Sequence, residues 1–233
     1  MILCIETTSD ICSAAIVTEH GVMAIRESGE DREHSRLLAP YINELFNETG
    51  IGSKDLDAVA ISAGPGSYTG LRIGTSLAKG IAYGSGIPLI AVDTMLALWH
   101  NMVASYPSMV EPGSDRLFVP MTDARRMEVY CSVIAADGTI VSPVSATIID
   151  EESFSNLLEK GEVLFFGSGA EKCRSVITRP GAIFPEERIG CSAAAMREPA
   201  IKACSEKRFE DVAYFQPLYL KEFMATRPKK SLP

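Results

Sequence analysis

The residues best suited to chemistry lie in the turn after the first predicted strand. Glu6, Thr7 and Thr8 follow the apolar run at residues 2–5, so a carboxylate and two hydroxyls gather where a buried strand ends. Oxygen ligands of this kind suit Mg²⁺ and the phosphates that accompany it. They equally suit a hydrogen-bonded hairpin turn that binds nothing, and the sequence leaves both interpretations open.

A second candidate is the glycine-rich turn Gly-Pro-Gly-Ser at residues 64–67. It follows the apolar run 59–61 and precedes a predicted helix over 69–83, so its amides point to a helix N-terminus, where anions bind. Gly64, Gly66 and Ser67 are therefore candidate phosphate ligands. Their spacing fits neither a Walker A loop nor the GxGxxG dinucleotide motif. A tight turn without a ligand is the alternative.

The second half of the chain carries its own acidic residue, Asp123, just after a predicted strand over 116–121. If both halves share one topology, Glu6 and Asp123 face each other across a cleft that could hold a nucleotide and Mg²⁺. Arg125 and Arg126 follow Asp123 and either contact a phosphate or partner carboxylate, or remain in solvent.

The remaining chemistry is sparse. The six cysteines include no CxxC pair, and several lie in apolar runs, where a free thiol packs as a small hydrophobic group. No Ser-His-Asp arrangement with supporting motifs supports a peptidase. We therefore predict no catalytic residue and no metal ligand, and we expect a reducing, cytoplasmic location.

Composition limits the partners. The chain has 233 residues, 46% of them hydrophobic, a formal net charge of -8 and a mean hydropathy of +0.11. The acidic balance argues against a surface whose main task is to bind nucleic acid. No apolar run reaches the ~18 residues of a membrane span, and the N-terminus lacks the basic start of a signal peptide, so no membrane contact is expected.

The elements that position these residues repeat along the chain. Each half predicts three strands, a helix, a strand and a helix, with a Pro- and Gly-rich boundary at residues 107–114. We predict an α/β protein with the duplicated ribonuclease H-like, actin-like fold and two lobes, 1–106 and 107–233. The predicted strands are 2–5, 12–17, 22–27, 59–61, 89–92, 116–121, 127–135, 139–149 and 163–166. The predicted helices are 35–48, 69–83, one beginning at 94, 151–160, 170–177 and a helical stretch over 192–207 divided at Pro199.

Two helices of the first half have features of an interface. The helix over 35–48 has a broad apolar face made of Leu37, Leu38, Tyr41, Ile42, Leu45 and Phe46. The helix over 69–83 places small residues at every fourth position, namely Gly70, Gly74, Ala78 and Ala82. Each interior glycine costs about 1 kcal/mol relative to alanine, which indicates the close approach of another backbone. That backbone belongs either to this chain's own sheet or to a partner.

Several segments together resemble the bacterial TsaB family, also called YeaZ. They are LCIETTSDICSAAIV, REHSRLLAPYINEL, AISAGPGSYTGLRIGTSLAKGIAYGSGIPLIAV, TDARRMEVY and PLYLK. The resemblance implies an actin-like fold and a role in forming threonylcarbamoyladenosine beside the anticodon of certain tRNAs. It implies a non-catalytic partner of the paralogue TsaD, which together with the TsaE ATPase supports the activity of TsaD. It further implies tRNA contact only through the complex, a homodimer when TsaD is absent, and no required cofactor, with weak ATP or ADP binding at best.

The resemblance also assigns residues. TsaD-like proteins carry His-x-x-x-His after the equivalent strand, and these metal-ligand positions fall here on Thr94 and Leu98, which are poor ligands. In TsaB relatives the first two helices form a bundle with the matching pair of TsaD, which here implies an interface of Leu37, Leu38, Tyr41, Leu45, Gly70, Gly74 and Ala78. Two other functions remain open: an independent ATP-dependent phosphotransferase or ATPase, and a stand-alone homodimeric scaffold.

Overall fold

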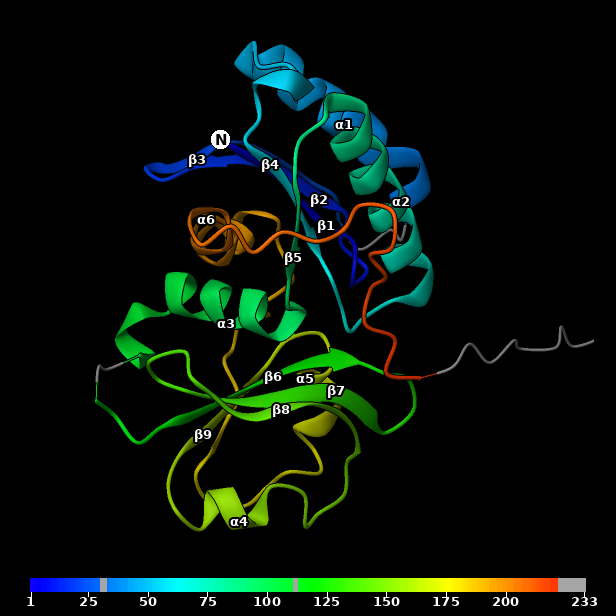
Figure 1. Ribbon diagram of the computed structural model, residues 1–233. Helices are drawn as coiled ribbons and strands as arrows, with labels where there is room; N and C mark the ends of the chain where they lie inside the picture. Colours follow the sequence, from blue (N-terminus) through cyan, green and yellow to red (C-terminus); the bar gives the residue numbers. More distant parts are fainter. Residues whose placement is uncertain (30–32, 111–112, 222–233) are drawn as a thin grey trace, which may run out of the picture.

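The computed structural model describes residues 1–29, 33–110 and 113–221. The first sheet has the strand order β3-β2-β1-β4-β5. Three strands, β1 (Ile2–Glu6), β2 (Ser13–Thr18) and β3 (Gly21–Glu27), form an antiparallel meander. On the other side of β1, strands β4 (Ala58–Ser62) and β5 (Leu89–Val92) are parallel to it. This sheet occupies the upper part of Figure 1.

The second sheet repeats the arrangement, with the strand order β10-β9-β6-β7-β8. Its meander consists of β6 (Leu117–Asp123), β7 (Glu128–Ala135) and β8 (Ile140–Ile148), and β9 (Val163–Phe166) is parallel to β6. The short β10 (Ala182–Ile183), which pairs with β9 in the position of β5, was not predicted. The predicted fold class is therefore confirmed as a duplicated, two-lobed ribonuclease H-like fold.

Helices α1 (His34–Thr49) and α2 (Tyr68–Ser85) pack together on one face of the first sheet. Leu38, Ile42 and Leu45 of α1 are buried against the sheet. Ser67 caps the start of α2, where its side chain accepts a hydrogen bond from the Gly70 amide, and Gly86 caps the end of the helix in the left-handed conformation.

Each half of the chain also sends a helix toward the other half's sheet. Helix α3 (Thr94–Ser105) packs Met95, Leu98 and Met102 against the second sheet. Helix α6 (Arg197–Ser205) packs Ala200 and Ala203 against the first sheet. Figure 1 shows both helices between the two sheets. The limits 1–106 and 107–233 stay predictions, since each range supplies part of the other lobe's core.

Several helices of the second half differ from expectation. The predicted helix over 151–160 is reduced to α4 (Ser155–Leu158), because Phe154 has a φ of 63°, which interrupts a right-handed helix. The predicted helix over 170–177 is reduced to α5 (Ala170–Cys173). The division at Pro199 is wrong. That residue lies in the first turn of α6, where a missing amide hydrogen costs nothing.

After α6 the chain returns across the molecule as an irregular segment with one turn at 212–214; we call this segment, residues 208–221, the strap. It follows the edge of β5, where the Glu210 amide donates to the Leu89 carbonyl at 2.8 Å. In Figure 1 it continues past α2 and down to the second lobe. The strap is the last part of the chain that the structure describes.

Candidate functional site

The turn after β1 is built around a buried carboxylate. Glu6 is 0% exposed, and its Oε1 accepts hydrogen bonds from the amide and the hydroxyl of Thr8, both at 2.5 Å. Its Oε2 has no hydrogen-bond partner among the described residues. Burial raises the pKa of Glu6, while the Thr8 bonds and the nearby Ser62 hydroxyl act in the opposite direction. Ser62 itself is hydrogen-bonded to Thr94 at 3.0 Å.

Gly66, just before α2, and two glycines in the first half of α2 lie directly against this turn. A Cβ placed on Gly66 would collide with Thr8, and one on Gly70 or Gly74 would collide with Thr7. The Thr7 hydroxyl donates to the Gly70 carbonyl at 2.8 Å. The backbone whose close approach the glycines indicate is therefore this chain's own.

The predicted phosphate turn at residues 64–67 is also bonded within the chain. The Ser67 amide donates to the Thr8 carbonyl at 2.7 Å, and the Gly64 carbonyl accepts from the Thr94 amide at 3.1 Å. Gly64, at a φ of +103°, contacts the backbone of Leu218 in the strap. These bonds favour the alternative of a tight strand-to-helix turn, and nucleotide binding there stays a prediction.

Asp123 differs from its topological counterpart Glu6. It ends β6, its side chain is 47% exposed, and it forms an ion pair with Lys172. The Arg125 amide donates to its carboxylate at 3.1 Å, and Arg125 and Arg126 both have left-handed backbones. Glu6 is enclosed and Asp123 is paired within its own lobe, and a nucleotide cleft between the two carboxylates stays a prediction.

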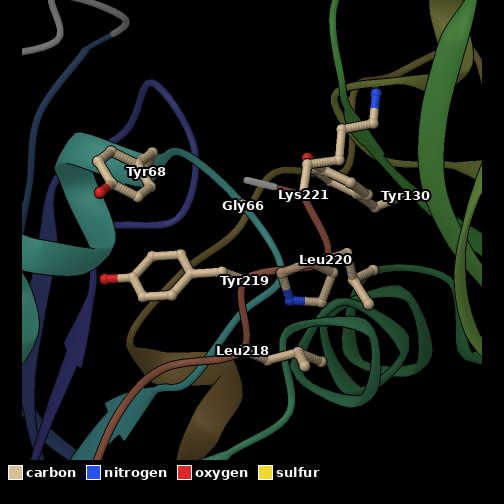
Figure 2. Close-up of a pocket in the computed structure, with 8 residues that line it drawn as sticks. Gly66, Tyr68, Tyr130, Leu218, Tyr219, Leu220 and Lys221 are labelled. Carbon is tan, nitrogen blue, oxygen red and sulfur yellow. The ribbon is translucent and has the colours of Figure 1, made fainter. Parts of the chain in front are cut away.

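The space between the lobes at this point is a cavity of about 30 Å³ (Figure 2). Ligand pockets for small molecules measure roughly 300–1,000 Å³, so this cavity holds little more than water. Its lining comes from the start of α2, from β7 and from the strap: Pro65, Gly66, Tyr68, Tyr130, Leu218, Tyr219, Leu220 and Lys221.

A larger depression, of about 430 Å³, lies between α1 and α2. A Cβ on Gly80 or on Gly84 would meet nothing within 4 Å, so both glycines face outward. We call this surface the outer face. It is lined by Ala39, Ile42, Asn43, Phe46, Ser53, Gly80, Ile81, Gly84 and Ser85, of which Ile42 is buried and the others are half-buried or exposed.

Most of the predicted interface residues lie inside the subunit rather than on the outer face. Buried residues cannot contact a partner, and five of the predicted ones are buried within the subunit: Leu38, Leu45, Gly70, Gly74 and Ala78. Leu37 and Tyr41 are half-buried against the same core. The exposed side of α2 carries a second stripe of small residues, Ser76, Gly80 and Gly84, which also recurs every fourth residue and was not singled out in the sequence.

The positions that carry paired histidines in TsaD-like proteins are packed into the interior. Thr94 is 0% exposed and engaged with Ser62, and Leu98 is 0% exposed among the apolar side chains beneath the second sheet. Across residues 1–29, 33–110 and 113–221, no group of three or more His, Cys, Asp or Glu side chains is arranged to hold a metal. No helix in these same ranges is long and apolar enough to cross a membrane.

Sequence comparison places the chain among tRNA-modification proteins. The family model for TsaD, tRNA N6-adenosine threonylcarbamoyltransferase, matches residues 27–215. The tRNA threonylcarbamoyladenosine biosynthesis protein TsaB of Escherichia coli is 27% identical over 229 residues, which cover 96% of each chain. TsaB of Bacillus subtilis is 29% identical over 94% of this chain and 93% of its own. TsaB of Haemophilus influenzae is 31% identical over 58% of this chain and 54% of its own.

Solved structures agree on the fold. YeaZ from Pseudomonas aeruginosa superposes with a TM-score of 0.76 at 23% identity, covering 94% of this chain and 99% of that one. A second Pseudomonas aeruginosa structure, described as similar to peptidase YEAZ, gives a TM-score of 0.75 at 21% identity over the same shares.

Proposed function

This chain belongs to the TsaD family, with TsaB (YeaZ) proteins as its relatives, and from that premise we propose that it is a non-catalytic partner of a TsaD-like subunit. In this role it activates the transfer of a threonylcarbamoyl group to the adenosine next to the tRNA anticodon. Its relatives are named as biosynthesis proteins for that modification. Our proposal is that the paralogue catalyses the transfer and that this chain activates it.

One observation carries the proposal. Thr94 and Leu98, at the positions of the metal-binding histidines of TsaD-like proteins, are both fully buried, and Leu98 is part of the hydrophobic core. Leucine offers no atom that coordinates a metal.

We assign partner binding to the outer face. Its centre is apolar and small, with Phe46 and Ile81 half-buried beside Gly80 and Gly84. Outward-facing glycines allow a partner helix to approach α1 and α2 closely. The occupant is the matching helix pair of the TsaD-like paralogue, and a second copy of this chain takes its place when the paralogue is absent. A TsaE-like ATPase joins the pair, and tRNA is bound through the complex.

The test compares two exposed glycines. Gly80→Leu places a bulky side chain on the outer face, whereas Gly161→Leu does so in an open loop of the second lobe, where an added Cβ also meets nothing within 4 Å. We expect Gly80→Leu to lose capture of the TsaD-like paralogue and stimulation of its transferase activity. We expect Gly161→Leu to keep both.

Thermal melting controls for folding, since both variants should melt at or above the temperature of the unmodified chain. Partner binding retained by Gly80→Leu would refute the assigned surface. Threonylcarbamoyl transfer by this chain without the paralogue would refute the non-catalytic role itself.

A further inference from the structure

The strap makes its first contacts on the N-terminal lobe. After its bond to Leu89 it passes α2, where the Lys79 ammonium donates to the carbonyls of Ala213 at 3.0 Å and Phe215 at 3.2 Å. The Leu218 amide then donates to the Ala63 carbonyl at 2.7 Å, at the end of β4. These bonds use the strap's backbone, so they fix its course along the first lobe.

The strap then crosses the glycine turn. The Leu218 carbonyl lies 2.8 Å from the point where a Cβ of Gly64 would be, so only a glycine leaves room for the strap here. Pro217, just before it, is buried. The strap therefore covers Gly64, at the start of the turn, and its side chains complete the wall of the small cavity (Figure 2).

The end of the strap contacts both lobes. Tyr219 lies against Tyr68 at the start of α2, with ring centroids 5.0 Å apart. Two residues later, Lys221 forms an ion pair with Glu128 of β7 and lies 6.0 Å from the ring centroid of Tyr130. Figure 2 shows Tyr219 beside Tyr68 and Lys221 beside Tyr130.

We propose that the strap is a latch between the lobes, held by the contacts of Tyr219 and Lys221, and that residues 218–221 must release before any solute larger than water can enter the small cavity that they line. The contacts of Tyr219 and Lys221 can open reversibly. Lys221 is 40% exposed and Glu128 21% exposed, and partly exposed ion pairs of this sort are individually weak. The proposal rests on geometry alone and does not depend on the proposed function.

Hydrogen–deuterium exchange of the full-length protein tests the latch. The probe is the Leu218 amide, which is protected only while it is bonded to Ala63. Losing an ion pair or an aromatic contact of this kind changes an opening equilibrium by about fivefold. We therefore expect about fivefold faster exchange at Leu218 in Lys221→Glu and in Tyr219→Ser, and restored protection in the charge-swapped double variant Lys221→Glu/Glu128→Lys.

Two controls separate release of the latch from general loosening. Lys160→Glu makes the same charge change at an exposed site away from the strap and should leave Leu218 unchanged. The Glu210 amide, at the beginning of the strap, should keep its protection in every variant. Unchanged exchange at Leu218 in both latch variants, or equal acceleration at Leu218 and Glu210, would overturn the proposal.

Discussion

The two stripes of small residues on α2 predict opposite responses to the same substitution. Gly74→Ala and Gly80→Ala both replace an interior helical glycine, so each gains about 1 kcal/mol of helix propensity. At Gly80 the new methyl group meets nothing within 4 Å. We therefore expect Gly80→Ala to increase the free energy of unfolding by about 1 kcal/mol.

At Gly74 the same methyl group collides with the Thr7 hydroxyl and lies 3.0 Å from Ile61 Cδ1. Overpacking a core costs typically about 1–3 kcal/mol. Moving Thr7 also breaks its hydrogen bond to Gly70, which is worth about 1 kcal/mol. After the gain in helix propensity, Gly74→Ala should lower the free energy of unfolding by about 1–3 kcal/mol.

Urea denaturation and thermal melting of the two variants measure the difference. In a chain of this size 1 kcal/mol corresponds to about 2–4 °C in Tm, so the two variants should melt on opposite sides of the unmodified protein. A Gly74→Ala variant that is as stable as Gly80→Ala would show that α2 does not lie against the Thr7 turn. In that case Gly74 would return to the interface, and the assigned outer face would be wrong.

Three further outcomes are expected. Because burial raises the pKa of Glu6, the contribution of this residue to stability is greatest below pH 4.5 and is lost as pH rises through the folded pKa. Glu6→Gln should therefore gain stability relative to the unmodified chain as pH rises, by about 1.4 kcal/mol per unit of pKa shift. The same difference in unfolding free energy between variant and unmodified chain at pH 5 and at pH 8 would contradict this. Burial raises the pKa of Cys4 and Cys12 to about 12, whereas Cys204 is only partly buried, so a thiol reagent at pH 8 should modify Cys204 first and the others only on unfolding, as counted by mass spectrometry. Calorimetry should find weak ATP binding at best, because the turn at residues 64–67 is hydrogen-bonded within the chain and lies against the strap; a submicromolar Kd would contradict this expectation.

Much of the fold was predictable because the hydrophobic pattern and the local turn chemistry agree. The strands of the first lobe are short apolar runs bounded by polar turns, and α2 has a capping serine before it and a glycine after it. The second lobe was harder to predict. Phe154 adopts a left-handed conformation that is uncommon for a residue other than glycine and is not predicted from its type. Strand β10 has only two residues, too few to show the two-residue alternation of a strand.

In the candidate site, the burial of the two carboxylates and the inward side of α2 could not be predicted from the sequence. Glu6 and Asp123 do occupy equivalent strand ends, but Glu6 is 0% exposed and hydrogen-bonded to Thr8, whereas the Asp123 side chain is 47% exposed and paired with Lys172. The spacing of Gly70 and Gly74 correctly indicated a close backbone approach but not whose backbone. Which side of a helix faces inward is set by tertiary packing, and two stripes with the same spacing cannot be ranked from the sequence alone.

The position of α6 on the first sheet has a consequence for synthesis of the chain. Strand β5 ends at Val92, yet the helix that covers one face of its sheet begins only at Arg197. At translation rates of about 5–20 residues per second, roughly 5–20 s separate the two. During that interval Ile2, Cys4 and Ile90 lack the cover of α6, so this face of the nascent N-terminal lobe should be more exposed than in the finished protein. An expressed fragment that stops before α6 should share that exposed face and bind chaperones or aggregate, even though it contains every strand of its own sheet.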